Sequence, residues 1–438
     1  MKKLFLLFMF LFAFVLTINA QILLETQFSG PLGSGARAMG MGGAFIAIAD
    51  DATATTWNPG GLGQIENVEI TAVGSHYSFS RHDPAVSQVY YFAGASYRSG
   101  SSNSYDLLGI TVPIRPLPET DFKLVLQYSY QRFIDFNLKS GTNAIPFQNV
   151  FFHPETGHRI MEFGYIYNDE EFEGGLDGHS IGVGMSLTSW LNLGVTANFW
   201  TNGFSGSTYI EAYFTGEDLV TGKRYEGFLQ EVHINEGNFR GTSFNLGALI
   251  NVTDSFNIGL VYKGDFTFTD EDKHGNKKGE VHYPRSVGLG AAYRPIDNLT
   301  LAVDYTTTEW SEGKAIYGGE EKFFPRQDLE YTTNAEFPSE MQHDTSQWRF
   351  GAEYVFISDD LLIPLRCGAY FDKQYFADAN DNIPVYLGLT AGAGIVWEGF
   401  VIDMAVVHVS GEFQAEYTAS TQADFNYTKV IASIIYRF

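Results

Sequence analysis

Large apolar residues alternate with glycine, polar or charged residues along most of the chain. In the segment 286–293 (SVGLGAAY), valine, leucine, alanine and tyrosine occupy every second position, and the segments 181–187 and 299–306 repeat the pattern. A period of two is that of a β-strand, because successive side chains of a strand point to opposite faces, whereas a helix has a period of 3.6. The pattern predicts an all-β protein. Alternation alone fits a soluble sandwich as well as a membrane barrel.

One predicted strand indicates which residues face which side. In the segment 347–356, Trp348, Phe350 and Tyr354 alternate with Arg349 and Glu353. An arginine that faces lipid at the bilayer midplane costs about 2–4 kcal/mol. If this strand crosses a membrane, the aromatic residues therefore face the lipid and the two charged residues face the interior.

The connections between the predicted strands alternate in length. Short connections such as 295–297 and 358–360 alternate with long polar ones such as 135–177 and 311–344. Tight periplasmic turns and long outer loops are typical of bacterial outer-membrane barrels, and a soluble sandwich gives no reason for this asymmetry. A sheet can lie in hydrocarbon only when it is closed, since an open edge would leave unpaired backbone groups. We therefore expect a membrane-spanning antiparallel β-barrel.

The number of strands follows from the same asymmetry. Thirteen segments after Ser104 have the pattern of strands: 104–114, 122–134, 178–188, 191–203, 240–252, 256–267, 283–294, 299–310, 345–357, 361–373, 384–397, 400–413 and 425–438. Because such barrels have an even number of strands, we expect about 14, with the first strand at either 67–80 or 87–99. If both segments were full strands the number would be 15, and a further strand at 160–167, within the long connection 135–177, would make it an even 16.

Both ends of the chain carry export signals. Residues 1–20 have Lys2 and Lys3, then an apolar stretch from Leu4 to Leu16 and a small residue, Ala20, which is the arrangement of a cleaved signal peptide. The apolar stretch is too short for a spanning helix, which needs roughly 20 residues. The last strand ends with Tyr436 and Phe438 on one face, which resembles the signal that the barrel-assembly machinery of Gram-negative bacteria reads.

A segment without alternation lies between these signals. Nine glycines fall between Gly30 and Gly63, among many alanines. Barrels of about 8 strands are filled by side chains and barrels of 16–18 strands are open pores, so about 14 strands leave a lumen that a segment of this size can close. The expected organisation is a signal peptide at 1–20, an N-terminal plug inside the lumen at 21–66 and a barrel at 67–438.

Composition excludes several other functions. The chain has 27 basic and 51 acidic residues, for a net charge of −24, which opposes nucleic-acid binding. A single cysteine excludes disulfides and four-cysteine zinc sites. The acidic clusters 169–171 and 270–272, and Asp378 with Asp381, match no complete calcium loop, so we assign no metal and no cofactor. No hydrolase or protease motif is found, and we expect no enzymatic activity.

The segment 34–52 (SGARAMGMGGAFIAIADDA), followed by 57–62 (WNPGGL), resembles the N-terminal signature of the FadL-type transporters of long-chain fatty acids and aromatic hydrocarbons. The match covers about 30 residues and is ordered, which makes it specific. Gly60 stands where the family often has alanine. The matching residues are Arg37, Gly40, Gly42, Gly43, Asp50, Asp51, Asn58, Pro59 and Gly60.

The resemblance implies a 14-stranded barrel in the bacterial outer membrane, closed by an N-terminal hatch. It implies uptake of a hydrophobic small molecule, which lands on an outer groove, enters a pocket beside the hatch and leaves through a gap in the wall. Partners would be that molecule, outer-membrane lipid, lipopolysaccharide and the barrel-assembly machinery, with the protein a monomer. Loop aromatic residues offer a landing surface or pack on one another: Phe147, Phe151, Phe152, Phe323 and Phe324.

Five charged residues have the parity that faces the lumen: Asp304, Arg349, Glu353, Arg366 and Asp403, with Lys263 near a strand end. Two roles are open for them. They hold the plug through Arg37, Asp50 and Asp51, or they contact a substrate carboxylate, for which Arg366 or Arg349 would serve because a guanidinium binds a carboxylate with two hydrogen bonds. Two other functions also remain open for such a barrel, namely a shuttle or anchor protein of a type IX secretion system and a nonspecific porin or assembly factor.

Overall fold

The computed structural model describes residues 33–83, 86–88, 91–93, 96–116, 122–142, 144–153, 156–272, 274–317, 320–323, 343–358, 361–375, 382–414 and 422–438. The predicted signal peptide and the first part of the predicted plug lie outside these residues. No helix among the described residues is long and apolar enough to cross a membrane.

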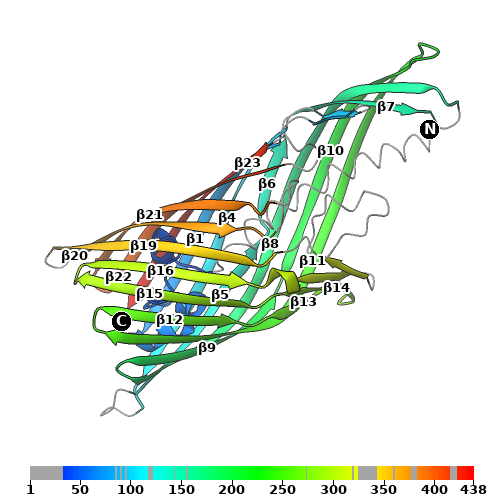
Figure 1. Cartoon of the computed structure of the whole chain (residues 1–438). Coiled ribbons are helices and arrows are strands. Elements are labelled where there is room, and N and C mark those ends of the chain that lie inside the picture. The colour runs from blue at the N-terminus through cyan, green and yellow to red at the C-terminus, as the bar shows by residue number, and fades with distance from the viewer. Residues whose placement is uncertain are drawn as a thin grey trace.

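Fourteen antiparallel strands form a closed barrel (Figure 1). They are β1 (Glu69–Asp83), β4 (Ser96–Ile114), β5 (Lys123–Asp135), β8 (Arg159–Thr188), β9 (Leu191–Thr201), β11 (Arg224–Thr253), β12 (Phe256–Lys263), β15 (Ser286–Ile296), β16 (Leu299–Thr308), β19 (Thr345–Ser358), β20 (Leu361–Lys373), β21 (Val385–Trp397), β22 (Phe400–Gln414) and β23 (Gln422–Arg437). Strand β1 pairs with β4 on one side and with β23 on the other, and this closes the sheet. The predicted fold class and strand number are confirmed.

The structure resolves the two open questions about the strands. The first strand is β1, in the segment 67–80, whereas the segment 87–99 contains the short β2 (Val86–Gln88) and β3 (Tyr91–Ala93) and the start of β4. The segment 160–167 adds no strand to the barrel, because it is the outer part of β8.

Side chains alternate between lipid and lumen as the pattern of 347–356 predicts. Trp348 is 49% exposed on the outer surface, whereas the next residue, Arg349, is only 1% exposed. In β15 and β16 the same parity exposes Val287, Leu289 and Leu301. The apolar outer surface suits a hydrocarbon environment, since the barrel has no open edge that would leave backbone groups unpaired there.

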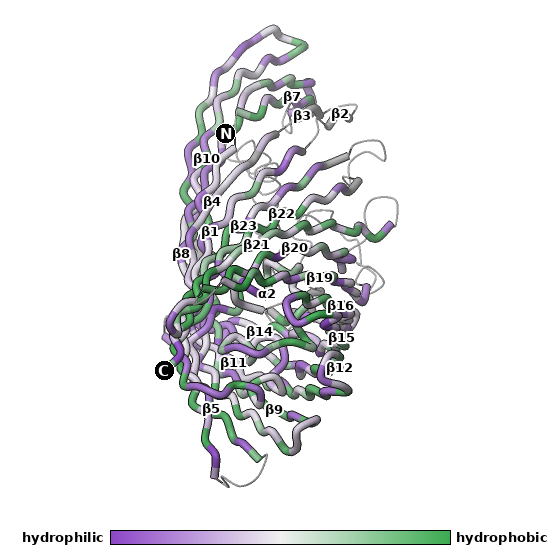
Figure 2. Tube along the Cα trace, turned by 90° about the vertical axis from the view of Figure 1, so that its left-hand side faces the viewer, coloured by the Kyte–Doolittle hydropathy of each residue, from purple (hydrophilic) through white to green (hydrophobic). Residues whose placement is uncertain are grey.

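The long connection 135–177 consists largely of strands, which corrects the expectation of a polar loop there, and the long connection 204–239 also forms strands. Strand β10 (Gly203–Asp218) pairs with the outer halves of β8 and β11, and β6 (Leu138–Thr142) and β7 (Ile145–Phe152) pair with β8. At about 3.3 Å per residue, the 30 residues of β8 extend about 100 Å along the strand, whereas a bilayer crossing takes about 9–11 residues. The outer parts of β8, β10 and β11 therefore project far beyond the rest of the barrel (Figures 1 and 2).

Three neighbouring strands end at the same height on the side of the long connections. Strand β12 ends at Lys263 and β13 (Phe266–Glu271) begins after Gly264, whereas β14 (Lys277–Tyr283) and β15 are separated by Pro284. Proline lacks the amide that a central strand would donate, so the predicted strand 283–294 is interrupted there. After β16 the chain forms a 3₁₀-helix, η2 (Trp310–Glu312), and then β17 (Lys314–Tyr317) and β18 (Glu320–Phe323). The predicted strands 256–267 and 299–310 contain no proline, but they too are cut short, at Lys263 and Thr308.

Beyond these breaks, aromatic side chains gather above the lumen. The cluster, which we call the aromatic cap, comprises Phe133, Trp200, Phe266, Phe268, Tyr283, Trp310 and Tyr375. Its rings contact one another, with centroids of Phe133 and Trp200 4.7 Å apart and those of Phe266 and Phe268 4.5 Å apart. Such contacts add about 0.5–1.5 kcal/mol per pair to the burial of the rings. The long connections therefore cover this end of the barrel.

Residues 33–65 lie inside the barrel, as the predicted plug requires (Figures 1 and 2). They form three short helices, α2 (Ala36–Gly40), α3 (Ala54–Trp57) and the 3₁₀-helix η1 (Pro59–Gln64). Their alanines and glycines are buried, and helix α2 contacts β20 to β23 while η1 contacts β8, β9 and β11. Small side chains allow this close approach of plug to wall.

Candidate functional site

The plug backbone touches the barrel wall at inward-facing glycines. A Cβ atom at Gly194 would lie 2.0 Å from the carbonyl oxygen of Pro59, and one at Gly259 would lie 2.2 Å from that of Ile46. Real Cβ contacts are never this short, so each position admits only glycine unless the plug moves. We call the whole set the glycine belt: Gly182, Gly184, Gly194, Gly247, Gly259, Gly290, Gly351, Gly368 and Gly392. It runs over eight strands and leaves no space between plug and wall at these points.

Polar side chains of the wall bind the plug backbone between the glycines. The carboxylate of Asp304 accepts hydrogen bonds from the amides of Phe45 (2.7 Å) and Ile46 (2.8 Å). Arg349 donates to the carbonyl of Gly42 at 2.8 Å. A buried backbone group without a partner costs roughly 1–3 kcal/mol, so these two wall residues stabilise a turn that has no regular secondary structure to satisfy it.

Two more wall residues bind the plug in the same way. The hydroxyl of Thr390 accepts from the amide of Gly42 and donates to the carbonyl of Gly40, both at 2.9 Å. Gln127 donates to the carbonyl of Ala52 at 2.7 Å. The plug is thus attached to β5, β16, β19 and β21, on several sides of the barrel, and each bond replaces one that water would otherwise make.

The turn at Gly42 and Gly43 explains part of the N-terminal motif. Both residues have positive φ, 67° and 71°. A Cβ at Gly43 would also lie 2.3 Å from Nη1 of Arg349, and one at Gly42 would lie 2.8 Å from the carbonyl oxygen of Phe350. Glycine adopts positive φ without strain and allows both contacts.

The Asn58-Pro59-Gly60 segment starts helix η1 and fixes it to the wall. The side chain of Asn58 accepts from the amide of Gly60 at 3.0 Å and donates to the carbonyls of Ile46 (2.8 Å) and Ala248 (3.0 Å). Asparagine is a favoured N-cap, and proline suits the first position of a helix. A Cβ at Gly60 would lie 2.9 Å from the backbone of Ala248, so glycine here allows a close contact.

A buried network of charges links the plug to β19, β20 and β22. Arg37 binds both carboxylate oxygens of Glu353, at 2.9 and 3.0 Å, and also contacts Asp50. Glu353 in turn binds Arg366 at 2.6 Å, and Arg366 binds Asp403 at 2.5 Å. Removing one partner of a buried ion pair costs about 3–5 kcal/mol, because the other charge stays buried. The plug is therefore anchored to the wall by this network.

Two acidic residues of the plug have separate surroundings. Asp51 is buried and accepts from the amide (2.8 Å) and hydroxyl (2.6 Å) of Thr53, which places it at the start of α3. Burial raises the pKa of Asp51, although Arg37 and Thr53 oppose the rise. Asp50 is partly exposed and forms an ion pair with Arg37.

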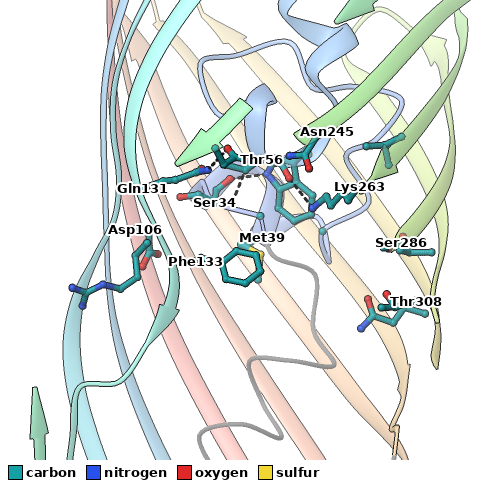
Figure 3. A pocket seen from close by; sticks show the side chains of 18 of the residues that line it. Ser34, Met39, Thr56, Asp106, Gln131, Phe133, Asn245, Lys263, Ser286 and Thr308 are labelled. Carbon is teal, nitrogen blue, oxygen red and sulfur yellow. Dashed lines mark hydrogen bonds between the residues drawn. The ribbon is translucent and has the colours of Figure 1, made fainter. Parts of the chain in front are cut away.

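A cavity of about 220 Å³ lies between the plug and the aromatic cap (Figure 3). Plug residues Met39 and Trp57 form one side, and the rings of Phe133, Trp200 and Tyr283 form another. The pocket is mixed in character, since polar groups also line it: Asp106, Gln131, Arg132, Asn245, Lys263 and Lys429. Concave sites with aromatic walls and a few polar groups are the usual form of small-molecule sites.

Several polar groups in the cavity are already paired. Lys263 donates to the carbonyl of Thr56 at 3.0 Å (Figure 3). Arg132 binds Asp177 at 2.7 Å and Asp135 at 2.8 Å. These contacts hold the polar side chains in fixed positions, which a specific binding site requires.

The structure brings together Arg37, Asp50, Glu353, Arg366 and Asp403, and it places Asp304 and Arg349 on the plug backbone. Arg366 does not line the cavity, and the two terminal nitrogens of Arg349 bind Gly42 and Gln347. Arg349 also lines the cavity, so its contact with a substrate carboxylate stays a prediction, whereas Arg366 belongs to the ion-pair network with Glu353 and Asp403. Tyr436 and Phe438 contact each other at the chain end, where the amide of Phe438 donates to Val68.

Sequence reasoning missed the aromatic wall of the cavity. Phe133 and Trp200 have the inward parity of β5 and β9, and each follows a run of polar or small inward residues. An aromatic residue that follows several polar, inward-facing positions at the outer end of a strand therefore indicates such a wall. This signal would have identified both Phe133 and Trp200.

A sequence model of the family described as outer membrane protein transport protein (OMPP1/FadL/TodX) matches residues 229–430. The barrel is similar to FadL-type barrels in fold. A FadL homologue of Pseudomonas aeruginosa aligns over 93% of this chain and 98% of its own, with 12% identity and a TM-score of 0.53. The Pseudomonas putida toluene transporter TodX aligns over 93% and 99%, with 13% identity and a TM-score of 0.53. These likenesses show the shared fold, and no curated protein sequence matches the chain.

The predicted resemblance and the outer-membrane location are therefore confirmed. The FadL-type barrel is an integral outer-membrane transport protein, and the comparisons support hydrophobic uptake rather than a role in type IX secretion. Among the described residues, no group of three or more acidic, histidine or cysteine side chains is arranged to hold a metal. Asp378, Asp381, Phe324 and the side chain of Phe323 lie outside the described residues, while Phe147 is buried and Phe152 is exposed.

Enlarging a residue of the glycine belt should loosen the plug. In Gly259→Ala the new methyl group meets the carbonyl of Ile46, and relieving such overpacking costs about 1–3 kcal/mol. We expect a higher ion conductance in planar bilayers and a lower unfolding temperature. Gly74→Ala is the matched control, since its Cβ would meet its nearest atom at an ordinary 3.5 Å. Equal conductance of the two variants would count against a seal at the belt.

Glu353→Gln should weaken the attachment of the plug to the barrel wall while preserving the shape of the side chain. The change leaves Arg37 and Arg366 facing each other without their shared carboxylate, with a loss of about 3–5 kcal/mol. We expect frequent opening events in single-channel recordings and a lower unfolding temperature. Glu226→Gln, on an exposed face outside the membrane, serves as control. Recordings that match the unchanged protein would show that the network does not hold the plug.

Proposed function

We propose that the cavity is a binding site for a one-ring aromatic molecule with a polar substituent, which the barrel takes up across the outer membrane. The size and lining of the cavity carry this proposal. An engineered apolar cavity of about 150 Å³ binds benzene, so about 220 Å³ accommodates a substituted ring. A long-chain fatty acid has to extend beyond this volume, past the aromatic cap, and is the second choice.

The two kinds of lining residue match the two parts of such a molecule. The rings of Trp57, Phe133 and Trp200 offer stacking surfaces, where offset or edge contacts are favourable. Lys263 brings a positive charge to the same cavity, which favours an oxygen-bearing substituent such as a hydroxyl or carboxylate. TodX is a toluene transporter, and toluene is also a one-ring aromatic molecule.

The plug supports uptake of a molecule rather than free passage of water and salts. The glycine belt brings plug and wall into direct contact on eight strands, and several backbone groups of the plug are bonded to wall side chains. A substrate that dissolves in apolar surroundings has its own driving force for entering a cavity with aromatic walls. This arrangement favours a selective transporter over a nonspecific porin.

The remaining expectations belong to the same proposal. The chain acts without catalysis, metal or cofactor, as its similarity to transport proteins suggests. The signal peptide ends at Ala20, the plug occupies 21–66 and the barrel 67–438. Tyr436 and Phe438 form the assembly signal, and the barrel stays monomeric among outer-membrane lipid and lipopolysaccharide.

Trp200→Ala should weaken ligand binding about tenfold, because the ligand loses one ring contact and its buried area. Titration of the detergent-solubilised protein with p-cresol, benzoate and oleate measures this effect. Trp190→Ala is the control, since Trp190 is an exposed tryptophan in the short β8–β9 turn. Equal losses in both variants, or tighter binding of oleate than of either aromatic probe, would contradict the assignment of a one-ring ligand.

Uptake into cells tests the transport function itself. Cells that carry the gene should accumulate radiolabelled toluene and p-cresol faster than cells that lack it, because lipopolysaccharide slows the entry of apolar molecules. Equal rates reject transport of these molecules. A defect in protein secretion in the same deletion strain would instead favour the shuttle or anchor function.

A further inference from the structure

The outer halves of β8, β10 and β11 present a broad sheet surface outside the membrane. The pairing register places Tyr165, Tyr213 and Phe228 in one row across the three strands, and each is about half exposed. Val232 and Ile234 on β11 are 59% and 76% exposed. Tyrosine and phenylalanine are enriched in protein interfaces, and contiguous exposed apolar patches mark interaction sites. This surface, which we call the outer sheet face, has no role in the cavity or the plug.

The outer sheet face belongs to a strongly acidic region. The segments 159–174 and 203–237 contain eleven acidic and three basic side chains, a net charge of −8. Asp169, Glu171 and Glu226 lie on the same face as the aromatic row and are exposed. A field of this sign repels phosphate groups and also a second copy of the same face, and it attracts a basic partner.

One edge of this sheet has no partner strand among the described residues. Strand β11 pairs with β10 from Arg224 to Asn238, but its other side first meets β13 at Asn238. The edge 224–237 contains no proline. Native proteins usually cover, shorten or interrupt such edges, because unpaired N–H and C=O groups are a template for an added strand. An extended peptide that pairs with an edge gains main-chain hydrogen bonds, and its side chains provide specificity.

We propose that the 224–237 edge and the outer sheet face bind an extended, basic segment of another protein, which adds a strand to β11. Lysine or arginine side chains of that segment would face the acidic groups, and its apolar side chains would extend the row formed by Phe228, Val232 and Ile234. The open edge and the charge are independent observations, and both select the same partner. The site is separate from the cavity and does not depend on the transport function.

The purified protein in lipid nanodiscs, titrated with a synthetic peptide, tests this site. The peptide is long enough to pair with 224–237. It carries lysine and valine in turn on the face that continues the outer sheet face, with threonine at the intervening positions. We expect saturable binding that weakens as salt is raised, and slower hydrogen exchange of the backbone amides of 225–235. The same peptide with glutamate in place of lysine should not bind. Absence of binding by the lysine peptide overturns the proposal.

Two controls separate strand addition from general attraction. The double variant Glu226→Lys and Glu236→Lys should weaken binding about tenfold, whereas Asp254→Lys with Asp297→Lys, at short turns on the other end of the barrel, should leave it unchanged. A peptide of equal charge in which prolines replace the valines should bind at least about tenfold more weakly, since proline cannot donate to the edge. Equal binding of the proline peptide, or equal effects of the two double variants, overturns the proposal.

Discussion

The contact between the plug backbone and the barrel wall is the constraint on which the rest of the structure depends. A 14-stranded cylinder is too wide for wall side chains alone to fill, so the lumen closes only if a chain segment enters it. That segment has few long side chains, and its backbone can reach the wall only where the wall has no Cβ atoms. The glycine belt provides this, and Asp304, Arg349 and Thr390 then satisfy the backbone groups that the close contact removes from water.

The same constraint explains why the alternating pattern has so many glycines on its inner parity. In a strand such as β15 the outer positions carry valine and leucine because they face lipid, whereas Gly288 and Gly290 face the plug. Read by itself, the sequence assigns the inner face to the lumen without indicating what fills it. The N-terminal motif and the inner glycines are two halves of one contact, and neither half alone predicts it.

Most of the barrel could be predicted from the sequence because each strand has its own local signal. The strand number, the parity of Arg349 and Glu353 and the plug followed from period, turn length and composition. The sequence did not predict the breaks after Lys263 and Tyr283 or the pairing of β10, since these depend on partners distant in sequence. Strands outside the membrane also carry many polar residues, so their sequences resemble those of loops. The network from Arg37 to Asp403 was open to two interpretations because parity gives direction but not distance.

The cavity lies between two closures that are held by different interactions. The plug is held by the glycine belt, by backbone hydrogen bonds and by buried ion pairs. Removing one partner of such an ion pair costs about 3–5 kcal/mol of stability. The aromatic cap is held by ring contacts of about 0.5–1.5 kcal/mol beyond burial, and its rings can also stack on an arriving aromatic ligand. The plug is thus attached to the wall by more kinds of contact than the cap. In the proposed uptake we therefore expect a ligand from outside to enter past the cap while the plug still closes the way to the periplasm.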